Sequence, residues 1–259
     1  MAKLSVVIIT KNEERILPET LKAVQMITDD VLVCDTGSTD ATIAVAIANG
    51  AKVIKEQWVG FGLTKNNANE EAKYDWILQL DADEIPDEQL QHLLKELPLL
   101  NEKELYSMQF KNFLAEKWIR YGEWGTDAHI RLFNRKQVKW NDAPVHEELQ
   151  YDETFTVTKL QGFILHKTMQ SKEQYEQKMK LYGERGGEKY YQQKKTGAWW
   201  KQYLSPVLSF VKNYFLKLGF LDGAEGVTVA KMQAGYTYKK YATLNSLLKK
   251  SKHLKKAKH

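Results

Sequence analysis

The first hundred residues alternate between short apolar runs and amphipathic stretches. The apolar runs have the length of buried strands, are rich in β-branched residues and fall at 4–10, 31–34, 52–56 and 76–80. Apolar residues at helical spacing separate them at 16–26, 42–49 and 64–73, and another such stretch follows at 87–97. This alternation predicts an α/β fold, with a mostly parallel sheet that carries helices on its faces.

The pattern changes from Glu104 onward. Strands are expected at 106–113, 129–134 and 154–160, as a mixed region beside the parallel sheet, and a polar helix is expected at 172–195. Aromatic and aliphatic residues then repeat at helical spacing over 200–218. We therefore expect one α/β domain at 1–170 and a basic, helical C-terminal extension at 171–259.

Charge is divided unevenly along the chain. Residues 1–150 contain 17 Lys and Arg against 25 Asp and Glu, whereas residues 151–259 contain 21 against 8. An acidic half can host metal chemistry, and a basic half suits an anionic surface or acceptor. Cys34 is the only cysteine, which excludes an intrachain disulfide and favours a reducing, cytoplasmic setting. No apolar run approaches the roughly 18 residues of a membrane-spanning helix.

Acidic side chains follow two of the predicted strands. Asp35 ends the second apolar run, and Asp81 and Asp83 follow the fourth. Ligands of open α/β sheets bind beyond the carboxyl ends of the strands, where Thr10 and Asn12 would line the same crevice. Paired carboxylates suit Mg²⁺ or Mn²⁺, which would neutralise a diphosphate leaving group. A solvated turn or a helix N-cap is the structural alternative.

The same stretches resemble a known family. The runs VVIITKNEE, VCDTGSTDAT and LQLDADE, in this order and spacing, resemble the nucleotide-sugar domain of family 2 glycosyltransferases. The runs WVGFGLTKNNA, RLFN, APVHEEL and ILHKT, with the segment 205–244, resemble a narrower group, the bacterial β-glucosyltransferases that add glucose to the inner-core heptose of lipopolysaccharide. The resemblance covers nearly the whole chain. It implies a Rossmann-like GT-A fold, a UDP-sugar donor, a divalent metal and an inverting transfer.

The resemblance also implies roles for single residues. The positions that it matches to nucleotide-sugar contacts are Thr10, Asn12, Glu13, Asp35, Lys65, Asn66 and Asp81. It implies metal ligands at Asp83 and Asp81, with Asp83 the more direct of the two. Where many relatives carry a tyrosine that stacks on the base, this chain carries Lys11 and departs from the pattern.

Four further side chains complete the expected site. An inverting transfer requires a carboxylate that takes the proton of the acceptor hydroxyl. We expect Glu147 in this role, with Glu148 as the rival. Adjacent residues of a strand face opposite sides, so only one of them should face the site; the alternative is that both are exposed. His166 is a candidate third metal ligand or a core histidine. Arg131 could bind a diphosphate or an acceptor phosphate, or form a structural ion pair.

The aromatic and aliphatic residues that repeat over 200–218 allow two interpretations. They could form a helix packed on the α/β domain, or a membrane contact in which Lys201, Lys212 and Lys217 flank aromatic residues. We expect the membrane contact. The acceptor implied by the resemblance is a lipid A–core saccharide, so the protein would lie peripherally on the cytoplasmic surface of the inner membrane.

Three other functions compete with this hypothesis. Another family 2 enzyme could use a different sugar or acceptor. A nucleotidyltransferase would carry a glycine-rich loop after the first strand, where this chain reads TKNEE. A basic nucleic-acid-binding protein would be expected to carry a recognisable motif in its basic half, and none is found, so no nucleic-acid partner is expected.

Overall fold

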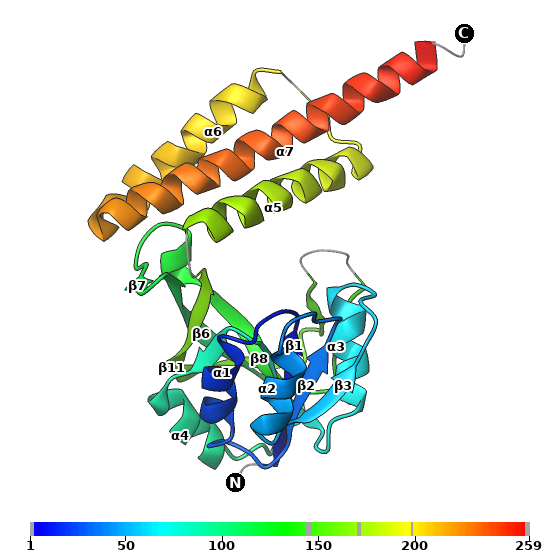
Figure 1. Cartoon of the computed structure of the whole chain (residues 1–259), viewed down its shortest axis with the longest axis vertical. Coiled ribbons are helices and arrows are strands. Elements are labelled where there is room, and N and C mark those ends of the chain that lie inside the picture. The colour runs from blue at the N-terminus through cyan, green and yellow to red at the C-terminus, as the bar shows by residue number, and fades with distance from the viewer. Residues whose placement is uncertain (1–2, 143–146, 170–171, 198, 257–259) are drawn as a thin grey trace. The chain divides into compact units, whose positions relative to one another are not determined.

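The computed structural model describes residues 3–142, 147–169, 172–197 and 199–256, and Figure 1 labels many of their elements. The chain divides into two compact units, and both are discontinuous in sequence. Unit 1 contains Met1–Lys111 and Asp127–Thr168, and unit 2 contains Asn112–Thr126 and Met169–His259. Within the described ranges, no helix is both long enough and apolar enough to cross a bilayer.

Unit 1 is built on a sheet with the strand order β3-β2-β1-β4-β8-β6-β11-β5. The parallel strands are β1 (Leu4–Thr10), β2 (Val31–Asp35), β3 (Lys52–Lys55) and β4 (Trp76–Asp81). The remaining strands are β8 (Ala128–Asn134), β6 (Glu104–Leu114), β11 (Thr156–Met169) and β5 (Glu84–Pro86). Antiparallel pairing joins β4 to β8, β8 to β6 and β11 to β5. The predicted α/β fold, with its Rossmann-like sheet, is confirmed.

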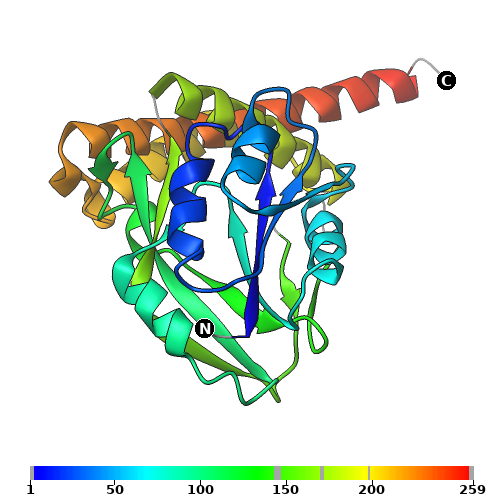
Figure 2. The ribbon, with the colours of Figure 1, turned by 60° about the horizontal axis from the view of Figure 1, so that its bottom comes forward.

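Each face of this sheet has its own hydrophobic core. On one face, Leu4 and Val6 pack with α1 (Leu17–Val24), α2 (Thr42–Ala48) and α4 (Glu88–Glu96), and Figure 2 shows α1 and α2 over this face. On the other face, Val7 and Cys34 pack with Ala68 of α3 (Phe61–Glu70). Successive side chains of a strand point to opposite faces. A strand covered on both faces is therefore apolar at nearly every position, as the sequence of β1 is.

The position of β1 gives the sheet a topological switch point. β1 lies between β2 and β4, so the connections of the parallel strands diverge on either side of it. Such a switch point leaves an opening beyond the carboxyl ends of the strands. Thr10 of β1 is in register with Asp35 of β2, and Ile9 is in register with Asp81 of β4. The polar residues that follow these strands are therefore gathered at one edge.

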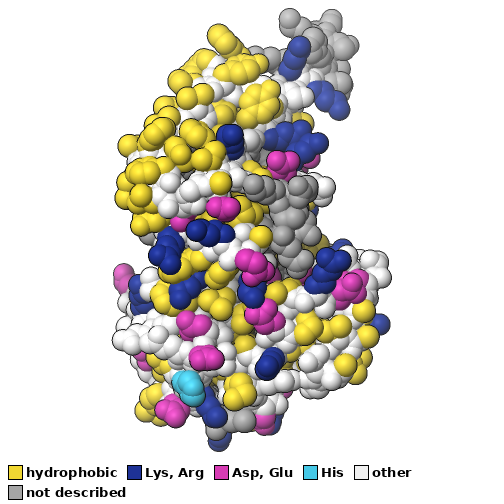
Figure 3. All heavy atoms as spheres, turned by 60° about the vertical axis from the view of Figure 1, so that its left-hand side comes forward, with side chains coloured by type: hydrophobic (Ala, Val, Ile, Leu, Met, Phe, Trp, Pro, Cys, Tyr) yellow, Lys and Arg dark blue, Asp and Glu magenta, His cyan; other side chains and the backbone are white. Residues whose placement is uncertain are grey.

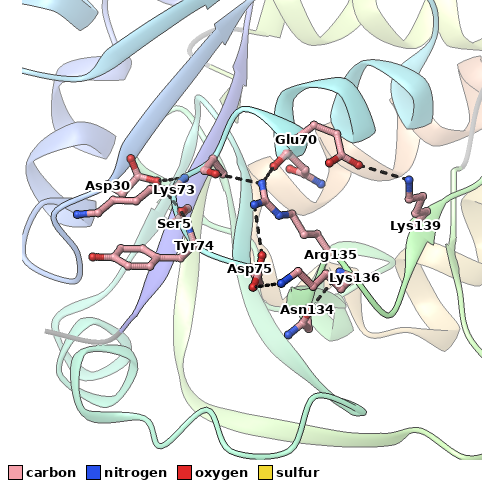
Figure 4. A network of polar contacts seen from close by, with 12 residues as sticks. Ser5, Asp30, Glu70, Lys73, Tyr74, Asp75, Asn134, Arg135, Lys136 and Lys139 are labelled. Atoms are coloured by element: carbon pink, nitrogen blue, oxygen red, sulfur yellow. Dashed lines mark hydrogen bonds and ion pairs between the residues drawn. The ribbon is translucent and has the colours of Figure 1, made fainter.

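A polar network lies at the opposite end of the parallel strands, near the residues where β1 and β4 begin (Figure 4). The Ser5 hydroxyl donates to Asp30 at 2.5 Å and accepts the N–H of Tyr74 at 2.9 Å. Asp75 pairs with Arg135 at 3.3 Å and with Lys136 at 2.6 Å. Arg135 also donates to two backbone carbonyls at the end of α3. These contacts fix the connection between α3 and β4 to the ends of β1 and β8.

Unit 2 contains the three helices α5 (Lys172–Gln192), α6 (Lys201–Val211) and α7 (Ala224–Lys256). A π-helical turn, Lys212–Leu216, and a 3-10 turn, Gly219–Asp222, connect α6 to α7. Its small core contains Leu114, Ile119, Tyr175, Val229 and Met232. The segment Asn112–Thr126, with the short strand β7 (Lys117–Trp118), therefore packs with residues that follow it by more than fifty positions.

Two buried polar side chains hold this segment in unit 2. Asp222 accepts the backbone N–H groups of Arg120 at 3.1 Å and Tyr121 at 2.9 Å. The Asn213 Oδ1 atom accepts the N–H of Glu123 at 3.1 Å. Both side chains are almost fully buried. Because buried polar groups are normally hydrogen-bonded, these two residues supply partners that the irregular backbone of the segment would otherwise lack.

Two elements differ from the sequence-based expectation. The helix expected over 200–218 ends at Val211, and the left-handed Leu218, with φ 59°, follows the π-helical turn. The strand expected to end at 160 continues to Met169 as β11. His166, which follows the expected strand, therefore lies within β11 and is in register with Glu84 of β5.

Candidate functional site

Two buried oxygen atoms lie at the ends of β1 and β2. Thr10 and Asp35 are register partners and are almost fully buried. Asp35 Oδ1 accepts the N–H groups of Gly37 and Ser38, each at 3.0 Å. In the described part of the chain, Asp35 Oδ2 and Thr10 Oγ1 have no hydrogen-bond partner. A buried polar atom left unpaired costs about 1–3 kcal/mol. These oxygens can therefore bind donor groups of a ligand.

Asn12 and Glu13 shape the loop that follows β1. Asn12 has φ 58°, a left-handed conformation that Asn adopts more readily than most residues. Its Oδ1 atom accepts the N–H of Thr39 at 2.7 Å, and its own N–H donates to Ser38 Oγ at 2.9 Å. The Glu13 N–H donates to Thr42 Oγ1 at 2.8 Å. These bonds tie the β1 loop to the β2 loop, and a direct contact of either residue with a nucleotide stays a prediction.

Asp81 and Asp83 belong to a cluster that the sheet completes from distant positions. Asp83 Oδ2 lies 3.6 Å from His166 Nε2, which brings together two of the expected metal ligands. The pairing of β5 with β11 places His166 in register with Glu84. Asp81 Oδ2 lies 3.8 Å from Arg131, and the Asp81 N–H donates to Glu84 Oε2 at 3.1 Å. The cluster thus combines three carboxylates with an imidazole and a guanidinium.

Glu84 and Arg131 form a buried ion pair within this cluster. Glu84 is 1% exposed, Arg131 is 9% exposed, and the guanidinium donates a hydrogen bond to Glu84 Oε1. Burial raises the pKa of Glu84, against the opposing effect of Arg131, and the charge of Asp81 raises it further. Burial works against the charged form of Arg131, but Glu84 and Asp81 outweigh it and raise the Arg131 pKa. Arg131 therefore forms a structural ion pair, and its expected contact with a phosphate stays a prediction.

The cluster has the donor atoms of a cation site without forming a closed cage. Within the described ranges, no three acidic, histidine or cysteine side chains converge closely enough to hold a metal ion by themselves. Mg²⁺ usually binds through one or two carboxylates together with substrate phosphates. Asp81, Asp83 and the imidazole of His166 are donor types found at Mg²⁺ and Mn²⁺ sites. These residues fit a cation that binds together with a diphosphate.

A cavity of about 560 Å³ lies beside this cluster, within unit 1. Its volume is in the range of about 300–1,000 Å³ that small-molecule sites occupy. The side chains that line it and concern the expected site are Lys65, Asp81, Arg131, Trp140, Glu147 and Glu148. The cavity therefore joins the acidic cluster to both candidate bases.

Lys65 and Glu147 form an ion pair in the wall of this cavity. Lys65 Nζ lies 2.6 Å from Glu147 Oε1, and the lysine is 3% exposed. The same ammonium lies 4.6 Å from the centre of the Trp140 ring, within the range of cation–π attraction. The structure therefore joins an expected donor contact to an expected base, a pairing between positions 82 residues apart.

Asn66 and Gly62 fix the backbone of the cavity wall. Asn66 Oδ1 accepts the N–H of Trp140 at 3.0 Å, and Asn66 Nδ2 donates to the Trp140 carbonyl at 2.9 Å. A Cβ atom on Gly62 would lie 1.8 Å from the carbonyl oxygen of Asn141. Asn66 thus positions the Trp140 segment, and its expected contact with the donor stays a prediction.

Glu147 and Glu148 both line the cavity, so the choice of base stays a prediction. Glu147 is half-buried and carries the ion pair with Lys65, whereas Glu148 is exposed. The Glu148 backbone carbonyl accepts the N–H of Asn141 at 3.0 Å. The residues 143–146 of the same motif lie outside the described residues.

Sequence reasoning missed Glu84 and Trp140. Glu84 directly follows the D-x-D pair, but its burial depends on β5 pairing with β11, which no local pattern reveals. Trp140 lies in a two-residue strand, β9 (Lys139–Trp140), which pairs with β10 (Leu149–Gln150) apart from the large sheet. The available signals were an acidic residue beside the turn and a tryptophan shortly before the glutamates.

Comparison with known proteins identifies the family. Residues 5–143 match the model described as glycosyl transferase family 2. An uncharacterized glycosyltransferase of Rickettsia typhi is 27% identical, over 98% of this chain and 90% of the relative. The lipopolysaccharide core biosynthesis glycosyltransferase LpsC of Rhizobium meliloti is 25% identical, over 92% of this chain and 93% of the relative.

A solved structure of glucosyl-3-phosphoglycerate synthase from Mycobacterium tuberculosis, in complex with uridine diphosphate, aligns at 26% identity with a TM-score of 0.35. The alignment covers 44% of this chain and 45% of that chain. The family model covers the strand ends that carry Thr10, Asp35, Asp81 and Asp83. Because that match spans more than half of the sequence, this protein belongs to glycosyl transferase family 2, whose enzymes move a sugar from a nucleotide-sugar donor.

Proposed function

We propose that this enzyme transfers glucose from UDP-glucose to a heptose of the lipopolysaccharide inner core, with inversion at the sugar carbon. The UDP part of this proposal rests on one observation: Asp35 Oδ2 is buried and unpaired among the described residues, and so is Oγ1 of its register partner Thr10. A uracil base offers an N–H group that this carboxylate can accept. The acceptor half is supported by similarity to LpsC over nearly the full length of both chains.

Asp81, Asp83 and His166 serve the diphosphate in this proposal. A divalent cation, when bound, neutralises the charge that develops on the departing diphosphate. Asp83 and His166, whose side chains already lie 3.6 Å apart, would hold it. Asp81 would reach the cation through water or bind the ribose of the donor. Arg131 lines the cavity and, with its charge shared with Glu84, would contribute to a phosphate contact only in part.

Glu147 is the proposed base. Its carboxylate would take the proton of the acceptor hydroxyl while that oxygen bonds to the sugar carbon and the bond to the diphosphate breaks. Lys65 holds this carboxylate before substrates bind. A diphosphate in the cavity offers Lys65 a second anionic partner and makes Glu147 available to the acceptor. The proposal therefore includes an order of binding, with the donor before the acceptor.

The test is a donor panel measured with the full chain. UDP-glucose, UDP-galactose, UDP-N-acetylglucosamine and GDP-mannose are offered with Mn²⁺, with Mg²⁺ or with chelator, together with a heptose-terminated core oligosaccharide. We expect metal-dependent transfer from UDP-glucose. Transfer from another UDP-sugar, or to another acceptor, would keep the family 2 chemistry and replace the substrate. No binding or turnover of any UDP-sugar would overturn the nucleotide assignment.

A further inference from the structure

The surface of unit 2 carries a broad apolar area on α6 and the turns that follow it (Figure 3). We call this area the α6 face, and its exposed residues are Trp199, Trp200, Tyr203, Leu204, Val207, Leu208, Val211, Phe215, Leu216, Leu218, Phe220 and Leu221. Their exposure runs from 37% at Val211 to 76% at Trp199. No residue of α6 is buried. Such contiguous apolar exposure is typical of an interaction surface.

The charges on this stretch have one sign. Residues 199–221 contain three lysines, Lys201, Lys212 and Lys217, and no Asp or Glu. Lys201 Nζ lies 5.7 Å from the centre of the Trp200 ring. Lys212 and Lys217 lie within 4 Å of Glu123, which offsets part of their charge. Aromatic side chains beside lysines are the composition of a segment that lies in the interface of a bilayer.

A second cavity, of about 490 Å³, adjoins this face. It is lined by Lys117, Trp118, Arg120, Tyr121, Leu221 and Asp222. Leu221 belongs to both the cavity and the α6 face, so the two are continuous. The Arg120 guanidinium lies 4.5 Å from the centre of the Trp118 ring. Asp222 is buried and accepts backbone N–H groups, so its charge faces the chain more than the cavity.

We propose that the α6 face binds the surface of an anionic phospholipid bilayer, and that this cavity holds a lipid head-group phosphate between Lys117 and Arg120. Guanidinium and ammonium groups bind phosphate oxygens through charge-assisted hydrogen bonds. The aromatic and aliphatic residues would enter the head-group region while the lysines meet its negative charge. This inference concerns unit 2 alone and does not depend on the proposed reaction.

Charge favours a bilayer over a second copy of the chain. In a symmetric dimer the same patch meets itself. Lys201 and its neighbouring lysines would then face their own counterparts across an apolar interface that has no acidic residue in the stretch 199–221. An anionic lipid surface supplies the missing negative charge without that repulsion.

Vesicle sedimentation of the full chain tests the proposal. Vesicles of phosphatidylcholine are compared with vesicles that also contain phosphatidylglycerol, at low and high salt. We expect binding to the anionic vesicles, weakened by salt because charge pairing is screened. Changing both Leu208 and Phe215 to Glu should weaken that binding about tenfold or more. Both positions are exposed, so folding should persist and is checked by circular dichroism.

Two matched variants separate the face from the cavity. Arg120→Gln should lower affinity about fivefold on anionic vesicles only, because one basic contact is lost. Its backbone N–H, which Asp222 binds, is unchanged by the substitution. Leu100→Glu alters a leucine of unit 1 that is more exposed, at 87%, and should leave vesicle binding unchanged.

Three results would overturn the proposal. Retained vesicle binding by the Leu208 and Phe215 double variant would exclude the α6 face. If Arg120→Gln lost affinity equally for the neutral and the anionic vesicles, the phosphate contact would be excluded. A wild-type chain that binds neither vesicle but forms a dimer, which the double variant dissociates, would assign the face to a second copy.

Discussion

The two carboxylate oxygens of Asp35 have different surroundings. Oδ1 holds the turn through two backbone N–H groups, and Oδ2 is without a partner in the described part of the chain. An Asn at this position can keep the turn, since its carbonyl oxygen accepts the same two bonds. It replaces the other oxygen with an amide donor, which would repel the N–H of a base. The position therefore allows binding to be changed separately from folding.

We expect Asp35→Asn to weaken UDP binding while the free energy of unfolding changes little. The loss of a charge-assisted hydrogen bond is worth about 1.5–3 kcal/mol, or roughly ten- to a hundredfold in Kd. Isothermal titration calorimetry with UDP measures it. Asp29→Asn, an exposed carboxylate that pairs with Lys73, is the control and should leave Kd unchanged. Unaltered UDP affinity in Asp35→Asn would remove this residue from the nucleotide site.

The paired glutamates provide a second prediction. Glu147→Gln should retain UDP binding and lower transfer by about a hundredfold or more, because a proton acceptor is lost. Glu148→Gln is the matched control, next in sequence and lining the same cavity. Transfer kinetics at saturating donor distinguish the two. If the Glu148 variant loses transfer and the Glu147 variant does not, the base has been assigned to the wrong residue.

Among the elements, β11 shows where local patterns fail. The strand expected over 154–160 continues through Gly162, which lies within β11 with φ 93°. A Cβ atom there would lie 2.7 Å from the backbone nitrogen of Leu90 and 2.9 Å from Asp87 Oδ1. The glycine therefore allows the first turn of α4, capped by Asp87, to approach the strand. A glycine that allows two elements to pack closely cannot be told from a turn glycine by sequence alone.

This contact predicts a loss of stability. Gly162→Ala adds a methyl group against α4 and strains a left-handed position, so we expect it to lower the free energy of unfolding by about 2–4 kcal/mol. Gly50→Ala is the control, with φ 74° and open space around its Cβ position. It should cost only about 1–2 kcal/mol. Urea denaturation measures both, and equal losses would show that the approach of α4 is not limiting.

The parallel strands and their helices could be predicted because each one buries its own apolar pattern. The D-x-D turn and Asp35 could be placed because parallel strands end at one edge. The pairings of Glu84 with Arg131 and of Lys65 with Glu147 could not, since each joins side chains brought together only by sheet pairing or loop packing. For Arg131 the sequence left a phosphate contact and an ion pair open, because no local pattern reveals Glu84 as its buried partner.

For unit 1 as a whole, Cys34 reports on unfolding. Burial, with smaller contributions from Glu56 and Asp35, raises the pKa of its thiol to about 12. At pH 8 roughly one folded molecule in ten thousand then carries a thiolate. We expect Ellman's reagent to label the native protein very slowly and the urea-unfolded protein at once. Rapid labelling of the native protein would contradict the burial of β2.

The raised pKa of Cys34 also makes the stability of the fold depend on pH. The pKa of the folded thiol lies above its ordinary value of 9.0, so the unfolded thiol ionises first as the pH rises. The stability associated with the protonated thiol is complete below about pH 9 and is lost progressively above it. Cys34→Ser should remove this alkaline component from urea midpoints measured between pH 8 and pH 10.

The shared core of unit 2 also bears on how the chain is made. Leu114 and Ile119 are synthesised early, but Tyr175, Val229 and Met232, with which they pack, leave the ribosome much later. During that interval two large aliphatic side chains have no place to be buried. A fragment that ends at residue 170 would have the same defect permanently. We expect it to bind chaperones and to precipitate, unless Leu114 and Ile119 are made polar, so that folding of the chain would depend on the C-terminal helices.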